Sequence, residues 1–136
     1  MEDQLPCMKG KRLLIVEDNQ LNMEIFKEII GQTEIEMEEA YDGVEALEKI
    51  SASPDGYYDM ILSDIRMIYM NGYRMARSIR KLDRKDVKKM PIIGMTADRE
   101  ICKVEDAIES GMNDQIYKPF SAKEISLFFT RYLKSD

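Results

Sequence analysis

Three acidic residues follow two apolar segments of the chain. Glu17 and Asp18 come after the run Leu13–Val16, and Asp64 comes after the run Met60–Leu62. Both runs predict buried strands, and parallel strands that lie side by side bring the residues after them to one edge of the sheet. Carboxylates gathered at that edge raise one another's pKa unless a positive group lies among them. The expected occupant is a divalent cation that prefers oxygen ligands, such as Mg²⁺.

Strand patterns alternate with helical patterns five times along the chain. The predicted strands cover residues 12–16, 34–39, 58–63, 92–96 and 115–117, and the predicted helices cover residues 20–30, 42–50, 72–82, 99–109 and a last segment from residue 121. Asp42 with Glu45, and Ser121 with Glu124, have the spacing of capping boxes, which supports two of the helix starts. Residues 1–10 are predicted to be a flexible tail, and residues 11–134 to form one domain.

This alternation predicts an α/β domain with a parallel sheet and right-handed crossovers. The segment 34–39 alternates glutamate with apolar residues, which suits an edge strand with one solvated face. We therefore predict the strand order 2-1-3-4-5, the flavodoxin-like, doubly wound (βα)5 sheet, whose switch point lies between the first and third strands. Thr96 and Lys118, at the ends of the fourth and fifth strands, reach the same edge as the three acids.

Composition excludes several classes of function. The chain has 136 residues, of which 44% are hydrophobic, so it can form one domain with one core. Its net charge of −6 argues against direct binding to nucleic acid or to an anionic membrane. It has no histidine, so it cannot itself donate a phosphoryl group from histidine. Cys7 and Cys102 form no motif, and we expect reduced thiols in the cytoplasm.

Two of the predicted helices have an apolar stripe. Leu21, Ile25 and Ile29 form the predicted apolar stripe of the first helix. The predicted apolar stripe of the last helix consists of Ile125, Phe128, Phe129 and Tyr132.

The basic segment 80–89 is interpreted as a solvated helix end and loop rather than a binding patch, because Asp83 and Asp86 interrupt it.

Five short motifs, each weak alone, occur in order on the expected elements. Together they resemble the response-regulator receiver domain over about residues 11–133, most closely the receivers of hybrid sensor histidine kinases. The motifs are Leu14-Ile15-Val16-Glu17-Asp18-Asn19, Ser63-Asp64-Ile65-Arg66-Met67, Met70-Asn71-Gly72-Tyr73, Pro91-Ile92-Ile93-Gly94-Met95-Thr96-Ala97 and Tyr117-Lys118-Pro119-Phe120.

The resemblance implies phosphoryl transfer onto an aspartate in a two-component phosphorelay. Asp64 would be the phosphoacceptor, and Lys118 would lie against its carboxylate. Asp18 and Asp64 would ligate Mg²⁺ directly, Glu17 mostly through water, and Arg66 through its backbone carbonyl. The physics of phosphoryl transfer agrees with this, because the protein must mainly position the groups and neutralise their charge.

The resemblance also implies roles for residues around the acceptor. The hydroxyl of Thr96 and the backbone N–H of Ala97 would bind a phosphoryl oxygen. Arg66 and Asp98 would modulate the attack of water on the acyl phosphate, as a pair that shields the phosphoryl group. The bond between Lys118 and Pro119 would be cis, as it is in the family.

The chain departs from the family pattern at two positions. The family usually has Met-Pro shortly after the acceptor, whereas this chain has Met67-Ile68, which predicts a more mobile loop. The family often has Tyr or Phe three residues before the lysine, whereas this chain has Gln115. A switch that rotates an aromatic ring together with a movement of Thr96 is therefore in doubt here, although the threonine itself could still move.

We therefore expect a phosphoacceptor switch rather than an enzyme that acts on other substrates. The donor would be a sensor histidine kinase or a histidine phosphotransfer domain, and a homodimer is possible. Phosphorylation would change the face made by the fourth helix, fifth strand and fifth helix; candidate contact residues there are Ile101, Val104, Phe129 and Tyr132. The alternative is a receiver-like binding or scaffold module that does not signal by phosphorylation.

Two further classes of protein are disfavoured. An aspartate-nucleophile phosphohydrolase usually needs a second acid two residues after the nucleophile, where this chain has Arg66. A flavin-binding protein of this fold must hold a phosphate in its first loop, where Glu17 and Asp18 would repel it.

Overall fold

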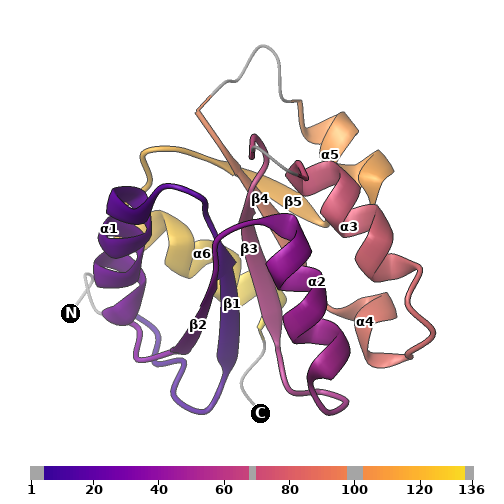
Figure 1. The fold of residues 1–136 in the computed structure, drawn as a ribbon. Helices are drawn as coiled ribbons and strands as arrows, with labels where there is room; N and C mark the ends of the chain where they lie inside the picture. Colours follow the sequence, from indigo (N-terminus) through magenta and orange to yellow (C-terminus); the bar gives the residue numbers. More distant parts are fainter. Residues whose placement is uncertain (1–4, 68–69, 98–102, 134–136) are drawn as a thin grey trace.

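A five-stranded parallel sheet forms the centre of the molecule (Figure 1). The computed structural model describes residues 5–67, 70–97 and 103–133. The strand order is β2-β1-β3-β4-β5, which confirms the predicted flavodoxin-like topology. The strands are β1 (Arg12–Val16), β2 (Glu36–Ala40), β3 (Met60–Asp64), β4 (Ile92–Thr96) and β5 (Asp114–Tyr117). The helices are α1 (Gln20–Gly31), α2 (Gly43–Ala52), α3 (Gly72–Arg80), α4 (Asp86–Lys89), α5 (Val104–Ser110) and α6 (Ala122–Tyr132).

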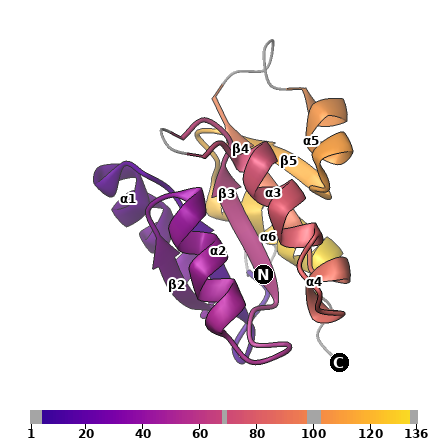
Figure 2. The ribbon, with the colours of Figure 1, turned by 45° about the vertical axis from the view of Figure 1, so that its right-hand side comes forward.

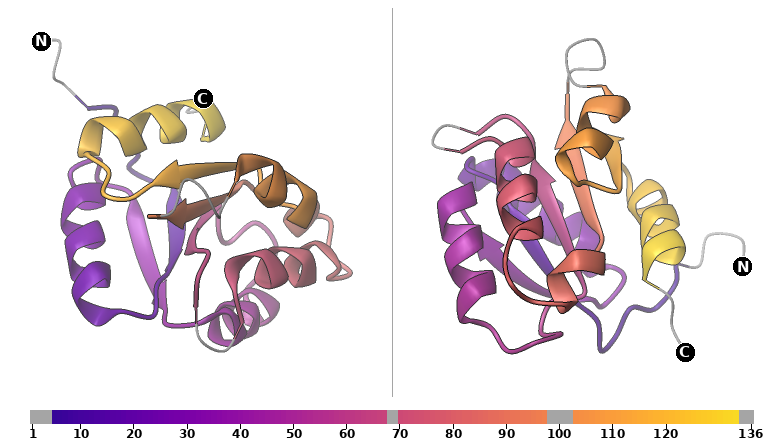
Figure 3. Two further views of the ribbon diagram at one scale, coloured as in Figure 1. Left: turned by 90° about the horizontal axis from the view of Figure 1, so that it is seen from above. Right: turned by 90° about the vertical axis from the view of Figure 1, so that its right-hand side faces the viewer.

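The helices cover both faces of the sheet (Figures 2 and 3). Alternate residues of β1 point to opposite faces, so Leu13 and Ile15 join one apolar cluster while Leu14 and Val16 join the other. The first cluster packs under α1 and α6, and the second packs under α2, α3, α4 and α5. Both faces of the central strands are therefore buried, as their continuous apolar sequences predicted.

The edge strand β2 begins two residues later than its alternating pattern predicts. Glu34 adopts φ +66°, in the left-handed region, and its backbone N–H donates to the carbonyl of Gly31 at 3.0 Å. A residue in that conformation belongs to a turn, so the strand starts at Glu36. Its burial pattern is still that of an edge strand, because Glu36 is exposed and Ala40 is buried.

The prediction for the buried face of α1 was wrong for Leu21 and Ile25, whereas Ile29 packs against the core as predicted. Leu21 and Ile25 are 70% and 46% exposed. The helix instead buries Met23, Phe26 and Ile30, which have the same helical spacing on a neighbouring face; the ring of Phe26 stacks on that of Phe120 with centroids 5.1 Å apart. Two apolar stripes compete in this sequence, and a partner distant along the chain decides which one turns inward.

The basic segment 80–89 is not a simple helix end and loop. It contains the short helix α4, which the sequence did not predict. The guanidinium of Arg80 donates to the carbonyls of Gly111 (2.9 Å), Val87 (2.8 Å) and Met90 (2.8 Å), and its burial lowers its pKa. Arg84 donates to three carbonyls at the end of α2 and in the loop after it. These two cations therefore hold backbone segments together.

The predicted helix starts at α2 and α6 are confirmed. Asp42 Oδ1 accepts a hydrogen bond from the N–H of Glu45 at 2.7 Å. Ser121 and Glu124 form the reciprocal capping box, with distances of 3.1 and 2.9 Å. The predicted start of the helix over residues 99–109 partly lies outside the described residues, and within them α5 begins at Val104.

Part of the predicted flexible tail packs on the domain. The side chain of Met8 is buried in the cluster under α1 and α6. Its backbone N–H donates to the carbonyl of Thr33 at 2.7 Å. Met8 therefore packs on the domain although it lies in the segment predicted to be a tail, and the burial of its apolar side chain stabilises this contact.

Candidate functional site

The carboxyl ends of β1, β3, β4 and β5 meet at one edge of the sheet, uppermost in Figure 1. Parallel pairing places Val16 beside Ser63, and it places Asp64 beside Met95. Thr96 pairs in the same way with Tyr117. The residues that end or follow these four strands are therefore brought together, as the sequence predicted from the topology.

The three predicted acids form a cluster at this edge. Glu17, Asp18 and Asp64 each offer a carboxylate oxygen, and these oxygens lie within 4.8 Å of one another. Glu17 and Asp64 are only 1% and 6% exposed, while Asp18 is half-buried. Two of the three carboxylates are thus buried. An ionised carboxylate in a buried site costs free energy unless a positive group compensates its charge.

Lys118 supplies a positive charge to the cluster. Its Nζ lies 3.4 Å from Asp64 Oδ1 and 3.6 Å from Glu17 Oε1. Its backbone N–H donates to the carbonyl of Thr96 at 2.8 Å, which ties it to the end of β4. The peptide bond to Pro119 is cis, as the resemblance implied. The lysine therefore faces the acids from the opposite end of the sheet edge.

The charges at the site do not balance. Burial and the nearby Asp64 together raise the pKa of Glu17 to about 6, against the opposing effect of Lys118. Burial also raises the pKa of Asp64, and Lys118 opposes that shift. Both carboxyl groups therefore lose their protons less readily than usual, even beside Lys118. This indicates that the cluster lacks positive charge.

The oxygens of Glu17 differ in their partners. Oε2 accepts a hydrogen bond from the backbone N–H of Asn19 at 3.1 Å. Oε1 is buried, and it has no hydrogen-bond partner among the residues that the structure describes. A buried oxygen without a partner costs free energy, and a cation in the cluster would remove that cost. Carboxylate oxygens are the hard ligands that Mg²⁺ prefers, so the donor set fits this ion.

The residues predicted to surround the acceptor lie at the same edge with different exposures. Thr96 is buried at the end of β4, and Ala97, the next residue, is exposed. Arg66 has an exposed side chain, and its backbone N–H donates to the carboxylate of Asp64. Asp98, the proposed partner of Arg66, and Ile68 lie outside the described residues, so their predicted roles stay predictions.

Gln115 is the residue at which the chain departs from the aromatic pattern of the family. It lies on β5 and is 5% exposed. Its Oε1 accepts a hydrogen bond from the hydroxyl of Tyr73, on the first turn of α3, at 3.4 Å. Sequence reasoning noted Gln115 but missed Tyr73, because nothing in the local pattern indicates that a residue of α3 reaches β5.

A hollow of about 340 Å³ lies beside the lysine. It is lined by Asn22, Ile25, Phe26, Ala97, Lys118 and Pro119, so helix α1 forms one of its walls. The exposed Leu21 and Ile25 belong to the same helix. The sequence pattern had assigned these two side chains to the core, so it missed an apolar surface next to the acidic cluster.

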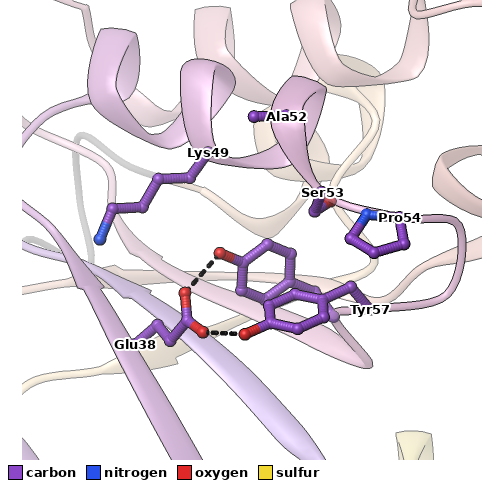
Figure 4. Close-up of a pocket in the computed structure, with 7 residues that line it drawn as sticks. Glu38, Lys49, Ala52, Ser53, Pro54 and Tyr57 are labelled. Carbon is purple, nitrogen blue, oxygen red and sulfur yellow. Dashed lines mark hydrogen bonds between the residues drawn. The ribbon is translucent and has the colours of Figure 1, made fainter.

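A second hollow, shown in Figure 4, shares none of these residues. It lies between the edge strand β2, helix α2 and the start of β3. Its carboxylate, Glu38, accepts hydrogen bonds from the hydroxyls of both Tyr57 and Tyr58, which lower its pKa. The acid therefore already has partners within the fold, and the two tyrosines serve to hold the edge strand.

Comparison with known proteins decides the family. The family model for the response regulator receiver domain matches residues 13–128. The chain belongs to this family. The match begins at the second residue of β1, covers the other four strands in full and ends within α6, and the receiver domain carries its acidic cluster directly after β1 and at the end of β3.

The relatives of this receiver domain are parts of larger signalling proteins. It is 31% identical over 137 residues to hybrid signal transduction histidine kinase L of Dictyostelium discoideum, and 32% identical over 120 residues to the sensor histidine kinase RcsC of Escherichia coli. The alignments cover 98% and 88% of this chain but only 8% and 12% of those kinases. The chain therefore corresponds to a small part of each relative.

A solved structure supports the same assignment. The receiver domain of a sensor histidine kinase from Pseudomonas aeruginosa matches with a TM-score of 0.82 and 29% sequence identity, covering 93% of this chain and 99% of that one. That structure holds a magnesium ion coordinated in its active-site cleft.

Among residues 5–67, 70–97 and 103–133, no helix has the length and apolar composition needed to cross a membrane.

Proposed function

We propose that Asp64 accepts a phosphoryl group from a phosphohistidine on a partner protein. The observation that carries this proposal is the 3.4 Å approach of Lys118 Nζ to Asp64 Oδ1 within a cluster of three acids. A buried aspartate in that environment is positioned rather than solvated, and phosphoryl transfer depends mainly on positioning and charge neutralisation.

The transfer exchanges one bond to phosphorus for another. A carboxylate oxygen of Asp64 attacks the phosphorus, so a P–O bond forms while the P–N bond to the donor imidazole breaks. The electron pair of the broken bond stays on the imidazole nitrogen. Lys118 lies close enough to Asp64 to contact the transferred phosphoryl oxygens, where its charge offsets the negative charge that two anionic reactants bring together.

The acids suit a magnesium site. We propose that Asp18, Asp64 and the backbone carbonyl of Arg66 ligate Mg²⁺ directly and that Glu17 holds it mostly through water. The ion, when bound, neutralises the charge on the acceptor and the phosphoryl group. The buried Oε1 of Glu17 supports this proposal, because it has no hydrogen-bond partner among the described residues and the nearby cation, Lys118 Nζ, lies 3.6 Å away.

The hydroxyl of Thr96 and the backbone N–H of Ala97 would hold a phosphoryl oxygen once Asp64 is modified. Thr96 ends β4 and Ala97 follows it, directly beside the acceptor strand, since Met95 pairs with Asp64. We propose that Arg66 and Asp98 control how readily water attacks the acyl phosphate. An exposed Arg66 side chain at the rim is compatible with that role.

The change at Thr96 would be transmitted to the surface made by α5, β5 and α6. Val104 and Ile108 of α5 are exposed there and could contact a downstream partner or a second copy of the chain. Phe129, another predicted contact residue, is fully buried and therefore serves the core. Tyr132 donates its hydroxyl to Asp114 at 2.9 Å, and Ile101 lies outside the described residues.

The donor would be a sensor histidine kinase or a histidine phosphotransfer domain. This follows from the kinases that the chain resembles and from the surface beside the acceptor. The exposed Ile25 lines the hollow beside Lys118, and Leu21 is exposed on the same helix, so α1 offers an apolar contact for a donor protein next to the reactive carboxylate. We place the reaction in the cytoplasm, and we assign the chain no reaction other than its own phosphorylation and dephosphorylation.

Transfer from a phosphorylated histidine phosphotransfer domain would test the proposal. The intact mass of the chain should rise by one phosphoryl group in the wild type, while the Asp64→Asn variant should stay unmodified under the same conditions. Equal modification of both proteins would show that the phosphoryl group is attached elsewhere.

A further inference from the structure

The start of α3 is fixed to the backbone of the acceptor strand. The N–H of Gly72 donates to the carbonyl of Ile65 at 2.7 Å. A Cβ atom at Gly72 would lie 2.7 Å from the carbonyl oxygen of Asp64, so only glycine permits this approach. Asn71 caps the helix by accepting a hydrogen bond from Arg74 N–H at 2.8 Å. The first turn of α3 is therefore held against the segment that carries the phosphoacceptor.

Tyr73, the next residue, extends from this turn to strand β5. Its ring packs against the apolar cluster under α2 and α3, and its hydroxyl donates to Gln115 Oε1 on β5 at 3.4 Å. This distance is long for a hydrogen bond between a hydroxyl and an oxygen, so the contact is weak and can be exchanged at little cost.

Gln115 lies beside the threonine of the site. It pairs with Gly94 on β4, and Thr96 is two residues further along that strand, on the same face of the sheet. A Cβ at Gly94 would lie 2.8 Å from Met112 Sδ and 2.9 Å from Ile65 Cδ1. The side chains of Met112 and Ile65 therefore fill the space over Gly94, next to Gln115 on this face of the sheet.

We propose that Tyr73 is a positioning residue that holds Gln115 in the unphosphorylated arrangement. In this chain the aromatic side chain of the switch would then come from α3, through a hydrogen bond, and not from a ring on β5. The inference rests on the proposed function, in which Thr96 binds a phosphoryl oxygen on Asp64. When Thr96 moves toward that oxygen, the amide of Gln115 follows it and leaves the hydroxyl of Tyr73.

Binding of a phosphoryl mimic measures this coupling directly. A contact present only in the unloaded protein opposes loading, so its removal must increase the affinity for the mimic. With fluoroberyllate and Mg²⁺, followed by the fluorine NMR signal of the bound complex, Tyr73→Phe should bind about two- to fivefold more tightly than the wild type. Tyr41→Phe is the matched control, because it removes a tyrosine hydroxyl that donates to Glu39, away from the acidic cluster.

A second variant makes the test specific. Gln115→Leu should tighten binding to a similar extent, and the double variant should show no further gain, since both changes remove the same contact. The inference would be overturned if Tyr73→Phe bound the mimic no more tightly than the wild type or than Tyr41→Phe. Additive effects of Tyr73→Phe and Gln115→Leu in the double variant would overturn it as well. A purely structural contact would lower the free energy of unfolding in these variants without changing the affinity.

The two proposals fail in different ways. If the wild type binds no fluoroberyllate with Mg²⁺ and gains no phosphoryl group at Asp64, the proposed function is wrong and the role of Tyr73 falls with it. If the wild type binds the mimic and the Tyr73→Phe affinity does not change, only the role of Tyr73 is wrong.

Discussion

The Nζ of Lys118 lies 3.4 Å from Oδ1 of Asp64 although 54 positions of the chain separate the two residues. The cis bond to Pro119 and the hydrogen bond from Lys118 N–H to Thr96 fix the lysine at the end of β5. Within the described residues, this amino group opposes the raised pKa values of both Glu17 and Asp64. It is therefore central to the charge balance of the site.

Replacement of this lysine should impair phosphorylation. Without the amino group, the pKa of Asp64 rises further and the developing charge on the phosphoryl oxygens loses a partner. We expect Lys118→Met to slow modification by acetyl phosphate about a hundredfold or more, measured by intact mass over time. Lys123→Met, which removes an exposed lysine of α6, should leave the rate unchanged. A comparable loss in both variants would argue against a local role for Lys118.

Glu17 should make the metal-free protein less stable as the pH rises. Its pKa is about 6 in the folded protein, against an ordinary value of 4.5, so the folded state binds its proton more tightly than the unfolded state does. The contribution of Glu17 to stability is thus fully present below about pH 4.5 and is lost as the pH rises to about 6.

The Glu17→Gln variant tests this sign. In EDTA at pH 7 it should unfold with a free energy about 1–2 kcal/mol higher than that of the wild type, and the difference should shrink at pH 4.5. Urea titrations at both pH values give the two differences. Glu28→Gln, an exposed change on α1, should show neither effect. A wild type that is the more stable protein at pH 7 without metal would contradict the argument.

Gly72 should be the least replaceable of the glycines near the site. A methyl group at this position would lie 2.7 Å from the carbonyl oxygen of Asp64, and backbone atoms cannot move aside cheaply. Gly72→Ala should therefore lower the free energy of unfolding by about 1–3 kcal/mol. Gly31→Ala is the control, because its added Cβ would meet only Met37 Cε at an ordinary 3.6 Å. Equal stability of the two variants would show that α3 can shift away from the acceptor strand.

The exposed apolar side chains of α1 should matter for a protein donor and not for a small one. Ile25→Glu places a charge on the wall of the hollow beside Lys118. We expect phosphoryl transfer from a histidine phosphotransfer domain to slow at least tenfold, while modification by acetyl phosphate stays near the wild-type rate. Leu127→Glu on α6 is the control, since Leu127 is also exposed. Similar slowing with both donors would indicate damage to the site itself.

Much of the fold and of the site was predictable because the relevant signals are local. Strand β4 has the predicted bounds, since its five residues are apolar or small and buried on both faces. Glu17, Asp18 and Asp64 were found because each follows a strand whose direction the topology fixes. An acid directly after a buried strand has few positions available to it.

The features that the sequence did not reveal depend on partners distant along the chain. The rotation of α1 is set where Phe26 stacks on Phe120, and the reach of Tyr73 to Gln115 spans 42 positions. The buried role of Arg80 likewise depends on carbonyls that only the folded chain brings together. The periodicity of apolar residues indicates which side chains can be buried, but it does not identify the residues that they contact.

The most direct test of the central claim is the intact mass of the chain after incubation with acetyl phosphate and Mg²⁺. The wild type should gain about 80 Da, one phosphoryl group, and the gain should disappear in Asp64→Asn and in EDTA. An equal gain in Asp64→Asn would contradict the assignment of Asp64 as the phosphoacceptor. A wild type that gains no mass and binds no Mg²⁺ would contradict the phosphoacceptor function as a whole and would favour a receiver-like binding module.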